Sequence, residues 1–196
     1  MKFINLKAYF SRNIDSIKLK YKMMRTTIKS MVTLLFVATI SLSALAQDTK
    51  PAPASPPATA TGKVGAATIT INYSSPAVKG RTIWGGLEKY DKVWRAGANK
   101  TTTFETDKDI TVQGKKLPAG KYNFFLIPKE NGTWTAIFNK EVANTNPFNY
   151  KEAEDQLRVD VKVKALKENQ ERLVYKIDNK GVALEWEKVS VPLAIK

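Results

Sequence analysis

The sequence predicts an all-β fold, an antiparallel β-sandwich or flattened barrel of about eight or nine strands. Short segments such as 67–73 (ATITINY) and 157–163 (LRVDVKV) alternate apolar and polar residues, as half-buried strands do. Turn signals separate these segments, and Asn131-Gly132 is the strongest of them. Apart from a short turn expected at 152–156, no segment keeps a helical period, and this favours stacked sheets.

One segment is expected to lie at the centre of a sheet. Residues 121–128 (KYNFFLIP) carry large apolar side chains on both faces, so both faces of this strand should be covered. Elsewhere the outward positions are charged, which is typical of a sheet with one solvated side. In chain order, the expected strands are 67–73, 99–106, 110–113, 121–128, 133–139, 157–163, 171–178, 182–186 and 191–195.

The N-terminal part has the pattern of an export signal. Arg25 and Lys29 precede an apolar run at 31–45, and Ala44-Leu45-Ala46 fits the cleavage pattern of two small residues around one free position. We therefore expect a signal peptide at 24–46, cleavage after Ala46, and a location in the periplasm or outside the cell. A membrane anchor is the alternative, but the run is shorter than the roughly 20 residues of a spanning helix.

Two further segments lie outside the predicted domain. Residues 1–23 are interpreted as a mis-annotated upstream extension, with translation starting at Met23 or Met24; an unusually long basic leader is the other interpretation. Residues 47–63 are rich in Pro, Ala and Thr, contain no large apolar side chain, and are expected to form a disordered linker. A single β-domain is then expected at 64–196.

The composition excludes several classes of function. The sequence contains no cysteine and no histidine, so Ser-His-Asp catalysis, Cys-His catalysis and Cys- or His-ligated zinc are excluded. The net charge is +14, but half of it comes from residues 1–46, which hold eight Lys/Arg and one acid. The remaining bases alternate with acids and form no basic stripe, so nucleic acid is not an expected partner. No metal site and no cofactor is predicted.

The stretch 82–99 (TIWGGLEKYDKVWRAGAN) is the main candidate for a binding site. It concentrates large aromatic rings, glycines and polar side chains more tightly than any other part of the sequence. A guanidinium offers a planar set of donors to an anion, and an indole offers a flat face to a sugar or another ring. A small anion, a sugar-like molecule or an envelope component is the expected ligand. The candidate residues are Tyr73, Lys79, Arg81, Trp84, Trp94, Arg95 and Asn99.

The same residues also have a purely structural interpretation. In this interpretation, Trp84 and Trp94 belong to the core, Arg95 pairs with a carboxylate such as Glu105, and Asn99 forms hydrogen bonds with the backbone of a loop.

Two other functions stay open. One is an extracellular hydrolase that uses carboxylates, for which Glu88, Asp91 and Glu105 are the candidates. The other is a structural or oligomerising domain whose aromatic side chains pack against a partner or a second copy. No catalytic residue is assigned, and the oligomeric state is not predicted.

Five segments of the chain carry a family resemblance: SSPAVKGRTIWGGL, KVWRAGAN, TTFETDKDITVQGKKLPAGKYNFFLIP, WTAIFNK and LEWEKVSVPLAI. They resemble a known family of secreted bacterial proteins, domain of unknown function 2911. The resemblance covers about 65–196 and keeps the family's order of segments. It implies export, in agreement with the predicted signal peptide, and it implies no mechanism.

Overall fold

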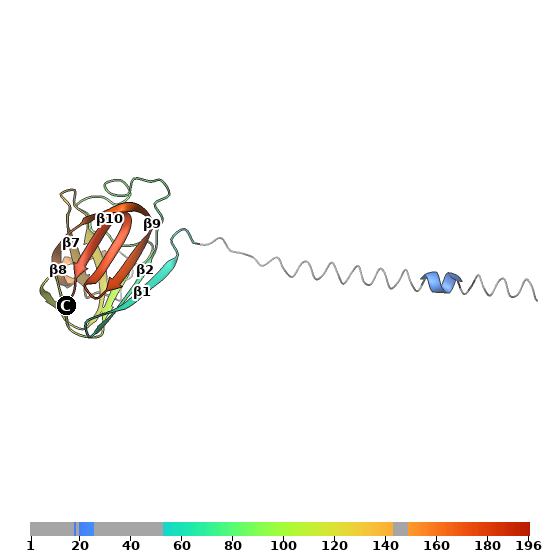
Figure 1. The fold of residues 1–196 in the computed structure, drawn as a ribbon, viewed down its shortest axis with the longest axis horizontal. Coiled ribbons are helices and arrows are strands. Elements are labelled where there is room, and N and C mark those ends of the chain that lie inside the picture. The colour runs from blue at the N-terminus through green and yellow to red at the C-terminus, as the bar shows by residue number, and fades with distance from the viewer. Residues whose placement is uncertain (1–17, 19, 26–52, 143–148) are drawn as a thin grey trace, which may run out of the picture. The chain divides into compact units, whose positions relative to one another are not determined.

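The computed structural model describes residues 18, 20–25, 53–142 and 149–196 (Figure 1). Its two units, 1–51 and 52–196, are treated separately. In the first unit, the described residues 18 and 20–25 are helical, and no described helix is long and apolar enough to cross a membrane. The predicted signal peptide beyond residue 25, its cleavage site and linker residues 47–52 lie outside the described residues.

The second unit is an all-β sandwich, which confirms the predicted fold class. One layer is an antiparallel six-stranded sheet in the order β1-β2-β3-β6-β7-β8, and the long ribbon of β9 and β10 packs against it (Figure 1). The sheets do not close into a barrel. The described elements are β1 (Pro57–Val64), β2 (Ala67–Ser74), β3 (Thr102–Thr106), β4 (Ile110–Val112), β5 (Lys115–Leu117), β6 (Gly120–Ile127), β7 (Thr133–Asn139), a 3₁₀ turn (Glu152–Glu154), β8 (Asp155–Lys162), β9 (Lys164–Asp178) and β10 (Gly181–Ala194).

The strands with the clearest patterns lie where the sequence predicts them. The alternation in 67–73 becomes β2, and 133–139 is β7. The doubly apolar strand β6 is central in the sheet, between β3 and β7, as its two apolar faces predicted. The inner face of the sheet and the ribbon share one core, whose largest fully buried side chains include Trp186, Phe104, Phe124, Phe138, Ile69, Ile71, Leu173 and Leu184.

The linker prediction is wrong at its C-terminal end, because residues 57–63 form most of β1. This strand pairs with β2 along its whole length, from Pro57 opposite Ser74 to Val64 opposite Ala67. Its small residues are a packing requirement: a Cβ added to Gly62 would lie 2.7 Å from Cγ2 of Ile177 in β9. The small residues that suggested disorder therefore allow β1 to lie close to β9.

Two further strand boundaries differ from the prediction. The strand expected from 99 begins at Thr102, because Ala96 (φ 50°) and Asn99 (φ 57°) have left-handed backbone conformations that interrupt it. Strand β9 begins at Lys164, seven residues before the expected start. Its first part is exposed on both faces, so no alternation marks it, and pairing with β10 holds it in place.

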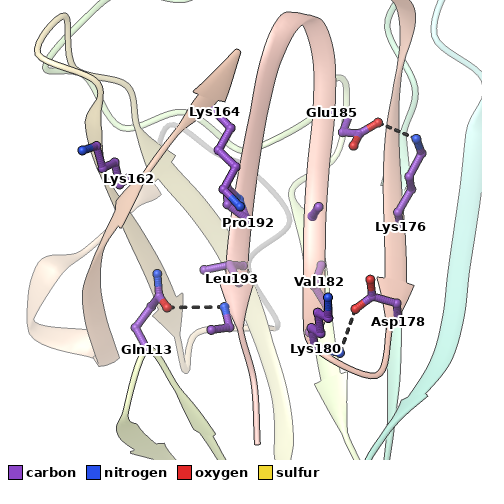
Figure 2. Close-up of a pocket in the computed structure, with 13 residues that line it drawn as sticks. Gln113, Lys162, Lys164, Lys176, Asp178, Lys180, Val182, Glu185, Pro192 and Leu193 are labelled. Atoms are coloured by element: carbon purple, nitrogen blue, oxygen red, sulfur yellow. Dashed lines mark hydrogen bonds and ion pairs between the residues drawn. The ribbon is translucent and has the colours of Figure 1, made fainter. Parts of the chain in front are cut away.

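Strand β10 folds back on itself so that its two limbs lie side by side (Figure 2). Residues 181–190 pair with β9, whereas at the end of β10 the carbonyl of Ala194 accepts the amide of Gln113, the residue after β4, at 2.9 Å. Across the limbs, the amide of Ile195 donates to the carbonyl of Lys180 at 3.1 Å. The fold-back is accompanied by two register shifts, with Glu187 between them in a left-handed conformation (φ 56°).

The two ends of the domain are fixed to its interior by backbone hydrogen bonds. At the start, the amide of Ser75 donates to the carbonyl of Pro56 at 2.8 Å. At the end, Thr111 and Lys196 exchange two hydrogen bonds, of 2.8 and 3.1 Å. Both terminal segments are therefore integral parts of the sheet structure.

The close contact of the limbs predicts that Gly181→Ala is severely destabilising. A Cβ at residue 181 would overlap the carbonyl oxygen of Leu193 and lie 2.9 Å from the amide nitrogen of Ile195, and φ is +141°. We expect a loss of at least about 3 kcal/mol in the free energy of unfolding, measured by urea denaturation.

Gly114→Ala is the matched control, because this glycine also has a positive φ (+79°) but no atom within 4 Å of the added Cβ. Its loss should be only about 1 kcal/mol, the strain of the backbone alone. Equal losses in the two variants would mean that the limbs can separate to admit a methyl group.

Candidate functional site

All four tryptophans of the chain gather in one cluster. The ring of Trp84 meets the rings of Trp94, Trp134 and Trp186 edge-on, with centroids 5.5, 4.6 and 5.7 Å apart. Trp94 and Trp186 stack at 5.9 Å with an interplanar angle of 20°. The rings come from the loop between β2 and β3, from β7 and from β10, so the cluster joins the two layers of the sandwich.

Two of the four indole N–H groups have no acceptor in the part of the chain that the structure describes. Trp94 donates to the carbonyl of Gly97 at 3.1 Å, and Trp134 donates to that of Lys129 at 3.0 Å. The buried N–H groups of Trp84 and Trp186 have no partner. A buried donor without an acceptor costs about 1–3 kcal/mol. The cluster can therefore supply hydrogen bonds to a bound molecule or to water.

The loop that carries Trp84 is tightly wound. The amide of Glu88 donates to the carbonyl of Ile83 at 2.9 Å, and the amide of Gly85 donates to the carbonyl of Glu88 at 2.8 Å. Gly85 has φ +75°, and a Cβ there would lie 2.8 Å from Cε2 of Tyr90, whose ring packs over it. This glycine is therefore required for backbone conformation and for the close approach of an aromatic ring.

A cavity of about 420 Å³ lies between this loop and the fold-back of β10; we call it the loop pocket. Arg81 is held by two hydrogen bonds, from Nε to the carbonyl of Val78 (3.0 Å) and from Nη2 to the carbonyl of Ala77 (2.5 Å). Its Nη1 group makes no hydrogen bond to a described residue. The described residues that line the loop pocket are Gly80, Arg81, Thr82, Ile83, Trp84, Tyr90 and Glu187.

Glu88 is a half-buried carboxyl group next to two guanidinium groups. Burial raises the pKa of Glu88 to about 7, while the charges of Arg95 and Arg81 act in the opposite direction and lower it. The side chain therefore changes charge near neutral pH. It is absent from the described lining of the loop pocket, so it acts on the loop rather than directly on a molecule bound there.

The structure brings only some of the predicted site residues together. Trp84 and Trp94 are in contact, and Arg81 and Trp84 line the same pocket. Tyr73 lies elsewhere: its ring meets that of Tyr175 edge-on at 4.8 Å, and it lines a different cavity, on the first three strands of the sheet.

The other predicted site residues hold the backbone of the domain. The amide of Lys79 donates to Oε1 of Glu171 at 2.9 Å. Arg95 donates from Nη1 to the carbonyl of Asn99 at 3.0 Å, and Asn99 in turn donates from Nδ2 to the carbonyl of Ser55 at 3.1 Å. These contacts agree with the structural interpretation of Asn99, and they tie the start of the domain to the loop.

The candidate carboxylates have different surroundings. Glu105 forms an ion pair with Lys121 at 3.9 Å, and the two residues lie opposite each other on the neighbouring strands β3 and β6. Asp91 is exposed and lies in a left-handed turn (φ 58°). Among the described residues, no group of three or more acidic side chains is placed to hold a metal ion.

Sequence reasoning missed two residues of the loop pocket. Tyr90 lies in the candidate stretch 82–99, but its position at the pocket depends on packing over Gly85. Glu187 lies about 100 residues away, and only the left-handed turn in β10 brings it to the pocket. Its neighbours in sequence look like an ordinary alternating strand, so no local signal could have identified it.

Comparison with known proteins gives a family and no activity. A family model described as protein of unknown function (DUF2911) matches residues 55–195. The match starts two residues before β1 and includes the ten strands that the structure describes. No curated protein and no solved structure matches the chain significantly. Function must therefore be argued from the loop pocket and its surroundings.

The raised pKa of Glu88 predicts that Glu88→Gln changes how stability depends on pH. A carboxyl group whose pKa rises from 4.5 to about 7 on folding makes the fold less stable as pH rises between these values. Glutamine cannot ionise. The variant should therefore have a higher melting temperature than the wild type at pH 8 and a similar one at pH 4.

Glu130→Gln is the control, because this acid is exposed on the loop between β6 and β7. This variant should change the melting temperature only slightly, and by the same amount at pH 4 and at pH 8. A Glu88→Gln variant that is less stable than the wild type at pH 8 would show that attraction to Arg81 and Arg95 outweighs the burial of the carboxylate.

Proposed function

The chain belongs to the DUF2911 family of proteins of unknown function, and from that premise we propose that it is an exported binding domain without a catalytic centre. Its proposed ligand is a small sugar-like molecule held in the loop pocket. The observation that carries this proposal is the combination of Arg81 and Glu187 with the aromatic side chains of Trp84 and Tyr90 around one cavity.

The charges of the loop pocket favour a polyhydroxylated ligand over a simple anion. Arg81 offers donors at its Nη1 group, and Glu187 offers two acceptor oxygens. A sugar hydroxyl both donates and accepts, so it can use both side chains at once. An anion would gain from Arg81 but would be repelled by Glu187, and the two charges nearly cancel at the distance of an approaching ligand.

The aromatic side of the pocket is preorganised. Trp84 packs against three other indole rings, and Tyr90 packs against Gly85, so neither ring needs to be ordered when a ligand binds. A rigid site loses less conformational entropy on binding than a mobile one.

A binding role fits the described chemistry better than hydrolysis. The chain has no histidine or cysteine, and Glu187 is the only carboxylate among the described residues that line the pocket. Hydrolysis of a glycosidic bond by carboxylates needs a pair that flanks the bond. Glu88 has the raised pKa of a general acid, but it does not line the cavity.

The proposal is tested by titrating the domain 53–196 with glucose, N-acetylglucosamine and inorganic phosphate while following the four indole N–H signals by NMR. One of the two sugars should shift the signal of Trp84 at millimolar concentration, and phosphate should not. Glu187→Gln should weaken that binding about tenfold, the typical effect of losing a hydrogen bond to a charged group.

Glu130→Gln serves again as the matched control and should leave the affinity unchanged. Three results would overturn the proposal: no shift of the Trp84 signal by either sugar, a shift by phosphate alone, or equal affinities in the two variants. Release of nitrophenol from a nitrophenyl glycoside that is abolished by Glu88→Gln would replace binding with hydrolysis.

Export predicts a specific N-terminus. Protein recovered from a bacterial cell that expresses the full chain should begin at Gln47, because cleavage is expected after Ala46. Mass spectrometry of the periplasmic and medium fractions measures this directly. Recovery of the chain from the cytosol with residues 24–46 still attached would contradict it.

A further inference from the structure

A second hollow lies on the solvent side of the folded-back ribbon and shares no lining residue with the loop pocket (Figure 2). Its volume is about 460 Å³. Both limbs of β10 contribute to it, together with residues of β8 and β9. We call it the lysine groove, because four lysines line it: Lys162, Lys164, Lys176 and Lys180.

Among the described residues, only one of the four ammonium groups has a carboxylate within ion-pair distance. Lys176 forms an ion pair with Glu185 at 2.6 Å, across the two strands of the ribbon. The other acid, Asp178, accepts the backbone N–H of Lys180 through Oδ1 at 2.8 Å, at the turn between β9 and β10. No carboxylate of a described residue lies within 4.0 Å of the ammonium groups of Lys164 and Lys180.

An uncharged surface separates Lys164 from Lys180, two of the three lysines of the groove that have no ion pair to a described residue. In Figure 2, Lys164 lies along Pro192 on the second limb, whereas Lys180 lies at the start of the first limb. Ala183, Pro192 and Ala194 line the groove with side chains that are not buried in the core, whereas Val182 and Leu193 belong to the core beneath it. Lys162 stands at its margin. The groove exists because the limbs touch at Gly181, where a side chain would collide with the opposite limb.

We propose that the lysine groove binds a ligand with two phosphate groups joined by an uncharged body of about the size of a sugar. Lysine is a compact, strongly hydrated charge that commonly binds phosphate, and two separate ammonium groups suit two separate anions. The apolar surface between them receives the uncharged body. This site is independent of the loop pocket and of the ligand proposed there.

The test measures binding of glucose 1,6-bisphosphate to the domain 53–196 by calorimetry in low salt, with glucose 1-phosphate as the comparison. The bisphosphate should bind at least about tenfold more tightly than the monophosphate. Its affinity should fall as salt is added, because the lysines are exposed to solvent. The double variant Lys164→Gln/Lys180→Gln should lose most of the affinity.

Lys108→Gln/Lys116→Gln is the matched control, since it removes the same charge from exposed lysines outside the groove. It should keep wild-type affinity. Equal losses in the two double variants, or equal affinity for the mono- and bisphosphate, would overturn the proposal. Melting temperatures of both variants establish that the fold is intact.

A second arm of the experiment identifies the source of the phosphates. Vesicles of phosphatidylcholine with and without phosphatidylinositol 4-phosphate, which carries two phosphates on one inositol ring, are sedimented with the wild type and with both double variants. Sedimentation that needs this lipid and is lost only in the groove variant indicates lipid headgroups. Binding of the free bisphosphate without sedimentation indicates a soluble or glycan-borne ligand. If neither probe binds, the proposal is wrong.

Discussion

The structure of the domain depends on the contact between the two limbs of β10. At Gly181 the backbone of one limb meets the backbone of the other so closely that no side chain fits between them. The fold-back that brings the limbs together includes Glu187 in a left-handed backbone conformation, which is unfavourable for a residue with a side chain. The same turn directs Trp186 into the tryptophan cluster and Glu187 into the loop pocket, while the solvent side of the limbs forms the lysine groove. One backbone constraint thus organises both hollows.

The two hollows differ in electrostatic character, and this difference guides their assignment. The loop pocket holds one guanidinium and one carboxylate beside rigid rings, which suits a neutral ligand that forms many hydrogen bonds. The lysine groove has an excess of positive charge over an apolar surface, which suits an anionic ligand. The tryptophan cluster packs the loop against the ribbon and carries two N–H groups without described acceptors. The two proposed ligands would therefore share no contact residue.

The sequence predicted the parts of this structure that depend on local pattern. The alternation of apolar and polar residues identified β2, β7 and β8, and the two apolar faces of β6 predicted its central position. These predictions succeed because a buried strand face requires apolar side chains at every second residue. The polar first half of β9 and the small residues of β1 carry no such pattern, since their strand form comes from pairing with a neighbour. Trp84 and Arg81 were identified because their residue types are unusual. Glu187 was missed, because a residue about 100 positions away reaches the pocket only through the tertiary fold-back.

The hydrogen bonds between Thr111 and Lys196 have a consequence for how the protein is made. The middle of the chain cannot complete its pairing until the final strand is available, and the long-range contacts of the sandwich form late for the same reason. The domain therefore stays unfinished until the segment that contains Lys196 has been translated. For an exported chain, as proposed above, late pairing would preserve the extended state that a narrow secretion pore requires, which a prematurely folded sandwich would block.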